Sequence, residues 1–121
     1  MAYDSAEFTI NREQFSTSIA GATTEGCKFR HFQKMRLKAV HGAVLVAGTN
    51  AGHGYDIYHG TTSIATMAVG TSTAGVLFNS ATLNRDIGAM DQISVKSLVD
   101  ATGTAQLTYE FVVSPDAVET A

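Results

Sequence analysis

The stretch DQISVKSLVDATGTAQLTYEFVV, Asp91 to Val113, contains the clearest secondary-structure signal in the chain. Two runs in which apolar and polar residues alternate flank a short Asp-Ala-Thr-Gly-Thr link. Such alternation is typical of strands with one buried face. The residues expected to face inward are Ile93, Val95 and Ser97 on the first run and Ala105, Leu107, Tyr109, Phe111 and Val113 on the second. The stretch predicts an antiparallel hairpin with no obviously reactive side chain.

Similar short runs, separated by glycines, occur along the preceding chain. We expect further strands over residues 27–39, 43–47, 55–59, 63–69 and 76–79. About seven or eight short strands with turn signals between them indicate an antiparallel sandwich or barrel, of which the jelly roll is the usual eight-stranded form. The sequence therefore predicts an all-β fold, an antiparallel β-sandwich or jelly-roll-like barrel.

The length of the chain, 121 residues, is typical of one domain. Residues 1–26 are polar and rich in Ser, Thr and Ala, and we expect them to form an extended N-terminal arm with a possible edge strand. The β-sandwich domain is expected to cover residues 27–121. Pro115 follows the last strand, where the missing backbone N–H does no harm to the ladder.

The charge of the chain is low in two respects. Its formal net charge is -3, which argues against nucleic acid as the main partner of the whole domain. Charged residues make up 16% of the chain, whereas an ordinary soluble domain has roughly 25%. The surface must therefore consist largely of Ser, Thr, Ala and Gly, and such a surface suits a component that its neighbours cover. No membrane partner is expected, because the longest largely apolar stretch, residues 39–48, is too short to span a bilayer.

A cluster of cations stands out against this low charge. Five of the 8 Lys and Arg residues fall between positions 28 and 38. If residues 27–39 form one strand, one face is mostly apolar and the other carries Lys28, Arg30, Phe32, Lys34, Arg36 and Lys38. Three interpretations stay open: a solvated edge face on which lysines discourage strand addition, a docking strip for an acidic protein surface, or a nucleic-acid strip with Phe32 stacked on a base.

Signals for catalysis or cofactor binding are weak. The glycine-rich segment 47–60 leads into a strand-like run, whereas a dinucleotide site needs a glycine turn that opens a helix. The chain lacks a Gly-x-Ser-x-Gly motif, its acidic residues give no acid–base pair by spacing, and Cys27 is expected to be a small buried residue. We expect no catalytic residue, no cofactor and no metal, and therefore no enzyme.

The segments DQISVKS, DATGTA and QLTYEFVV, together with the Gly/Ala/Thr-rich LVAGTNAG and AVGTSTAG, resemble the small decoration or cement proteins of tailed-bacteriophage capsids. The resemblance covers residues 27–113. It implies a jelly-roll-like β domain that forms small homo-oligomers, with a homotrimer favoured and a dimer possible. It also implies that the major capsid protein is the partner, and that the protein clamps neighbouring capsomers on the capsid surface of a virion assembled in the host cytoplasm.

The resemblance carries over no functional residues, so the contact residues are hypotheses from the sequence alone. We expect the basic face from Lys28 to Lys38 to contact the shell, together with four residues of the arm: Tyr3, Phe8, Ile10 and Phe15. Four further residues are expected to form an inter-subunit contact or an outward tip: His53, Tyr55, Tyr58 and His59.

Other functions stay open as alternatives. A carbohydrate-binding module or fibre tip would use Tyr55 and Tyr58 against sugar rings. A phage tail or neck structural protein belongs to the same structural class. A small cupin-like metalloenzyme is the remotest alternative, and it would use His41, His53 and His59, although the chain lacks the His-x-His spacing of cupins.

Overall fold

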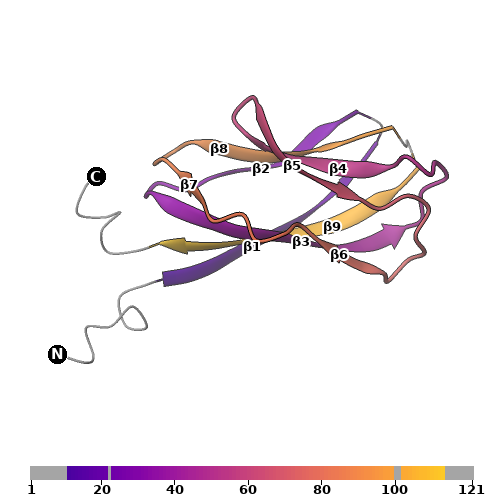
Figure 1. Ribbon diagram of the computed structural model, residues 1–121, viewed down its shortest axis with the longest axis horizontal. Coiled ribbons are helices and arrows are strands. Elements are labelled where there is room, and N and C mark those ends of the chain that lie inside the picture. The colour runs from indigo at the N-terminus through magenta and orange to yellow at the C-terminus, as the bar shows by residue number, and fades with distance from the viewer. Residues whose placement is uncertain (1–10, 22, 100–101, 114–121) are drawn as a thin grey trace.

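The computed structural model describes residues 11–21, 23–99 and 102–113, which form nine β-strands in two antiparallel sheets packed face to face (Figure 1). The first sheet contains β1 (Asn11–Ala20), β9 (Thr104–Val113), β3 (Met35–Val46) and β6 (Leu77–Asn79) in that order, and β7 (Arg85–Ile87) also pairs with β3. The second sheet contains β2 (Glu25–Arg30), β8 (Gln92–Ser97), β4 (Gly54–His59) and β5 (Thr62–Ala68). The predicted all-β sandwich is confirmed.

The strands pair in a nested order. β1 pairs with β9, β2 with β8, β3 with both β6 and β7, and β4 with β5, always antiparallel. This pattern arises when one long hairpin, closed at the β4–β5 turn, folds over to make two sheets, and it is the jelly-roll topology. The sixth strand of the usual eight is here divided into β6 and β7.

The sequence prediction was wrong about the pairing of the last two strands. β8 lies in the second sheet between β2 and β4, whereas β9 lies in the first sheet between β1 and β3. β8 ends at Ser97 and β9 begins at Thr104, so the two strands are further apart in sequence than the strands of a tight two-residue hairpin. The prediction of which side chains face the core was nevertheless confirmed, because all eight residues expected to point inward are buried.

The predicted single strand over residues 27–39 was also wrong. The chain leaves β2 after Arg30, crosses to the opposite sheet and begins β3 at Met35. The buried His31 holds this crossing, since its Nδ1 accepts the backbone N–H of Gln33 at 3.1 Å and its carbonyl accepts that of Met90 at 2.7 Å. The alternation of apolar and polar residues continues through the crossing, so it did not reveal the break.

The predicted separate strand over residues 43–47 was wrong, because these residues form the end of β3. The other predicted strands lie close to β4, β5 and β6. The expected strands 55–59 and 63–69 form the β4–β5 hairpin, in which Gly60 adopts a φ of 64° at the turn. Residues 11–20 form an edge strand that pairs with β9 along its whole length, from Asn11 opposite Val113 to Ala20 opposite Thr104. The arm residues Tyr3, Phe8 and Ile10 lie outside the described residues.

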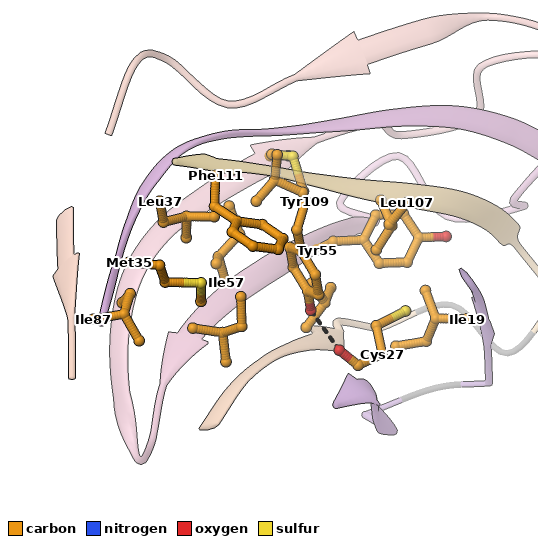
Figure 2. Close-up of a cluster of buried hydrophobic side chains, with 14 of the residues drawn as sticks. Ile19, Cys27, Met35, Leu37, Tyr55, Ile57, Ile87, Leu107, Tyr109 and Phe111 are labelled. Atoms are coloured by element: carbon orange, nitrogen blue, oxygen red, sulfur yellow. Dashed lines mark hydrogen bonds between the residues drawn. The ribbon is translucent and has the colours of Figure 1, made fainter. Parts of the chain in front are cut away.

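The core lies between the sheets and is dominated by large side chains from β9, β3 and β4 (Figure 2). Leu37, Ile57, Leu107 and Phe111 are almost fully buried there. One hydrogen bond joins the two layers across this core: the Tyr109 hydroxyl on β9 donates to the carbonyl oxygen of Cys27 on β2, at 2.6 Å (Figure 2). Burial raises the pKa of the Tyr109 hydroxyl, which therefore stays a donor.

Replacing Tyr109 with Phe should destabilise the fold by about 1–3 kcal/mol, because the buried Cys27 carbonyl loses this partner. Urea unfolding followed by circular dichroism measures the change. Tyr58→Phe is the control, since Tyr58 lies on β4 but is only half-buried. An equal loss of stability in both variants would contradict a special role for the inter-sheet bond.

Candidate functional site

The structure divides the basic residues among three places, so the predicted basic face on one strand was wrong. Lys28 and Arg30 lie on β2 in the second sheet, and Arg36 and Lys38 lie on β3 in the first. Phe32 and Lys34 lie in the crossing between them. The cations therefore surround one end of the sandwich, and the docking strip itself stays a prediction.

The crossing between β2 and β3 carries an exposed phenylalanine ring that stacks on a buried, hydrogen-bonded histidine. Phe32 is 72% exposed and stacks on the ring of His31, with 4.9 Å between centroids. Because the His31 Nδ1 accepts the N–H of Gln33, its Nε2 carries the proton and donates to the Glu13 carboxylate at 3.1 Å. Exposed Met90 lies beside this crossing in the left-handed region at a φ of 66°. This end therefore presents apolar groups to solvent next to a hydrogen-bonded histidine.

The four residues expected at a loop tip do not gather on the surface. His53 and Tyr55 are 2% and 1% exposed, and the His53 Nε2 lies 3.1 Å from the Tyr55 hydroxyl. Tyr55 also stacks on Phe78 within the sandwich. Tyr58 lies three positions after Tyr55 on β4, so its side chain points to the opposite face of the sheet. Tyr55 and Tyr58 therefore cannot form the sugar-binding platform that the sequence left open.

His59 belongs to a polar network at the end of β4. Its Nδ1 accepts the Nε–H of Arg85 at 3.0 Å, so its Nε2 carries the proton and donates to Asp91 at 2.9 Å. The backbone N–H of Gly88 donates to the same carboxylate oxygen. These bonds tie the β7–β8 link to β4. They hold the pKa of Asp91 below its ordinary value, chiefly through the hydrogen bond from His59.

The histidines that a cupin-like enzyme would use have separate partners. The His41 Nε2 lies 3.0 Å from the Glu110 carboxylate, whereas His53 contacts Tyr55 and His59 contacts Asp91. In the part of the chain that the structure describes, no three His, Cys, Asp or Glu side chains are placed to hold a metal ion. Burial raises the pKa of the Cys27 thiol to about 11, so this thiol is not an activated nucleophile.

The outer face of the first sheet has an uncharged central part, made by two rows of residues, which we call the neutral face. The register aligns its residues in rows across four strands: Ser16, Thr108, His41 and Asn79 in one row, and Ser18, Gln106, Ala43 and Leu77 in the next. A hydrogen bond of 2.6 Å joins the Ser16 and Thr108 hydroxyls. In a third row lies the Glu110 carboxylate beside His41, and the Arg36–Asp86 ion pair lies at the β7 end.

The outer face of the second sheet has the opposite character. Its central row places Glu25, Lys96, Asp56 and Thr66 side by side on β2, β8, β4 and β5. Lys28 adds a further cation, with its Nζ 3.7 Å from the Glu25 carboxylate. Alternating charges of this kind keep a surface hydrated. The two faces of the sandwich are therefore chemically distinct, and the neutral face is the one suited to burial.

The neutral face could not be found without the strand register. Its side chains come from β1, β9, β3 and β6, which are distant in sequence. One signal did exist: no Asp, Glu, Lys or Arg occurs between residues 39 and 55 or between residues 60 and 84. These two segments supply the later part of β3, together with β5, β6 and the loops around them. Of the predicted arm contacts, Phe15 is half-buried and stacks on Phe29, with 4.6 Å between ring centroids.

No known protein family matches the chain. No curated protein matches it either. Solved structures share its fold. A protein of the disulfide-linked pili of Bacillus endospore appendages has 16% identity and a TM-score of 0.50, with 88% of each chain covered. A chain of the cyanophage Pam1 capsid has 9% identity and a TM-score of 0.49, with 86% of this chain and 84% of that one covered.

A third similar structure is the Drosophila NLP core, which was described for pentamer formation and histone binding. It has 10% identity and a TM-score of 0.48, with 83% of this chain and 95% of that one covered. At 16% identity, the likeness to the pilus protein shows the β fold alone. The described part of the chain contains no helical segment that could span a lipid bilayer.

Because of the His59–Asp91 contact, we expect the free energy of unfolding to depend on pH. Because the folded-state pKa of Asp91 is lowered, its contribution is fully present above the unfolded-state pKa of about 3.9 and is lost as pH falls through the folded-state pKa. The urea midpoint of Asp91→Asn should therefore lie below that of the natural protein at pH 6, and the gap should shrink below pH 4. A gap that stays constant to pH 2.5 would contradict this account.

Proposed function

We propose that this protein is a structural virion protein that binds the capsid surface and stabilises the shell by clamping neighbouring capsomers. The neutral face carries this proposal. It spans four strands, and its two central rows, which contain Ser16, Thr108, His41 and Asn79, and Ser18, Gln106, Ala43 and Leu77, carry no Asp, Glu, Lys or Arg. The proposal assigns the chain no catalytic step and no cofactor.

The composition of the neutral face suits burial against another protein. Protein interfaces are depleted of charge at their centre, because burying a charge without a partner is costly. Ser16, Ser18, Gln106 and Thr108 offer short hydroxyl and amide groups that can bond to a partner's backbone, and Leu77 is an apolar anchor that is 79% exposed. A face of this kind loses little on desolvation, which favours a broad contact.

Clamping follows from a broad contact on many copies. A protein that bridges two capsomers makes its second contact at high effective concentration, so modest affinity at each side gives firm attachment. The fold suits this role, since its two antiparallel sheets present two chemically different outer faces. The neutral face would rest on the shell, and the charged face of the second sheet would keep the outside of the particle hydrated.

The proposal can be tested with empty shells assembled from the major capsid protein of the same virus. Gln106→Lys with Leu77→Lys places two charges at the centre of the neutral face and should weaken binding by about tenfold or more in co-sedimentation. Thr62→Lys with Ser63→Lys is the matched control, because it adds the same charge on exposed positions of β5. The control should bind within about twofold of the natural protein.

Equal loss in both variants, or binding unchanged by the neutral-face charges, would refute this docking face. Failure of the natural protein to bind shells would refute the proposed function.

The same assay tests the predicted docking strip through the triple variant Arg30→Glu, Lys34→Glu, Arg36→Glu at low salt. Reversing a steering charge weakens capture by an acidic surface most when screening is weak.

A further inference from the structure

The sheet edges differ in how they are protected. The described strands leave four edges: β1 on one side of the first sheet, β6 with β7 on the other, and β2 and β5 in the second sheet (Figure 1). An edge strand presents free N–H and C=O groups to which another strand can be added. Proteins therefore shorten, charge or interrupt their edges.

Three of the four edges follow this rule. β6 and β7 have 3 residues each, which is too short to bind a strand firmly. β2 has an irregular register between Gly26 and Phe29 and carries Glu25 and Lys28. β5 lacks charge, but its register with β4 shifts between Ile57 and Tyr58, so the strand is not regular along its length.

The fourth edge, β1, has none of these devices along most of its length. It is 10 residues long and pairs with β9 in an unbroken register from end to end. From Gln14 to Ala20 it contains no charged residue, no proline and no glycine. Among the described strands, none pairs with its outer edge. A long, regular and uncharged edge of this kind is suited to strand addition.

We propose that β1 of one chain pairs antiparallel with β1 of a second copy about a two-fold axis near Ser16, which joins the two first sheets into one. The composition of β1 is compatible with pairing to itself. An antiparallel arrangement places the charged start of one strand, at Glu13, opposite the uncharged end of the other, at Ile19, whereas a parallel arrangement would bring the two Glu13 carboxylates together.

The side chains agree with this arrangement on both faces. A two-fold axis perpendicular to the sheet keeps Phe15 and Ile19 of both copies on the core side. On the outer side, Ser16 and Ser18 would meet serine and glutamine of the second copy. Ser16 already makes such a cross-strand contact with Thr108 of β9. The joined sheet would present two neutral faces as one continuous surface.

This pairing favours a dimer over a trimer, because an edge-to-edge contact about a two-fold axis is closed by two chains. It does not depend on a shell, so it can be tested in the isolated full-length protein. If the chain dimerises but does not bind shells, the proposed function fails and this inference stands. If it binds shells as a monomer, the reverse holds.

The test uses opposite charges at the proposed axis. One variant carries Ser16→Lys and Ser18→Lys, the other Ser16→Glu and Ser18→Glu, and each is measured alone and in a 1:1 mixture by sedimentation equilibrium. The natural protein is expected to be a dimer. Each variant alone should dimerise about tenfold or more weakly, because like charges meet across the axis, and the mixture should regain the dimer.

Controls separate this edge from others and from misfolding. Thr62→Lys with Ser63→Lys, and Thr62→Glu with Ser63→Glu, place the same two charges on the β5 edge and should leave the dimer intact. Far-ultraviolet circular dichroism confirms that each variant is folded. Hydrogen exchange at β1 amides should slow as the natural protein is concentrated.

Several results would overturn the inference. These are a natural protein that is monomeric or trimeric at 0.1 mM, charged β1 variants that dimerise as well as the natural protein, or a mixture that stays monomeric when each variant is folded.

Discussion

The burial of β9 between β1 and β3, and against β2 across the core, is the constraint on which the rest of the structure depends. Its inward side chains Leu107, Tyr109 and Phe111 are almost fully buried, and the Tyr109 hydroxyl bonds to the Cys27 carbonyl in the opposite sheet. Its outward side chains set the rows of the neutral face. One strand thus fixes both the inside of the sandwich and the surface proposed for docking.

Alternation predicted which residues are buried but not which strands are neighbours. Ile93 and Val95 on β8 and Leu107 and Tyr109 on β9 face the same core, as expected. Two strands with one apolar face each can bury those faces side by side in one sheet or face to face across two. The pattern is the same in both cases. The choice depends on the partners β2, β4, β1 and β3, which are remote in sequence.

The same limit explains the outcome for the predicted contact residues. A cluster of charges is easily seen in a sequence, and the cations between Lys28 and Lys38 therefore predicted a basic face on one strand. A crossing held by His31 divides these cations between two sheets. The neutral face could not be predicted in this way, because it consists of uncharged residues on strands that only the register brings together. The burial of Tyr55 is similar: its neighbours His53 and Phe78 became known only with the fold.

The nested pairing has a consequence for how the chain acquires its structure. During synthesis β1 emerges first, yet its partner in the sheet, β9, emerges last, and β2 must likewise wait for β8. Contacts between such distant segments require closure of long loops, which makes folding slow. Until β9 arrives, both edges of β1 are free, so a nascent chain offers a strand able to pair with a neighbouring nascent chain. Production of soluble protein should therefore depend on the spacing and rate of translation as well as on the stability of the finished sandwich.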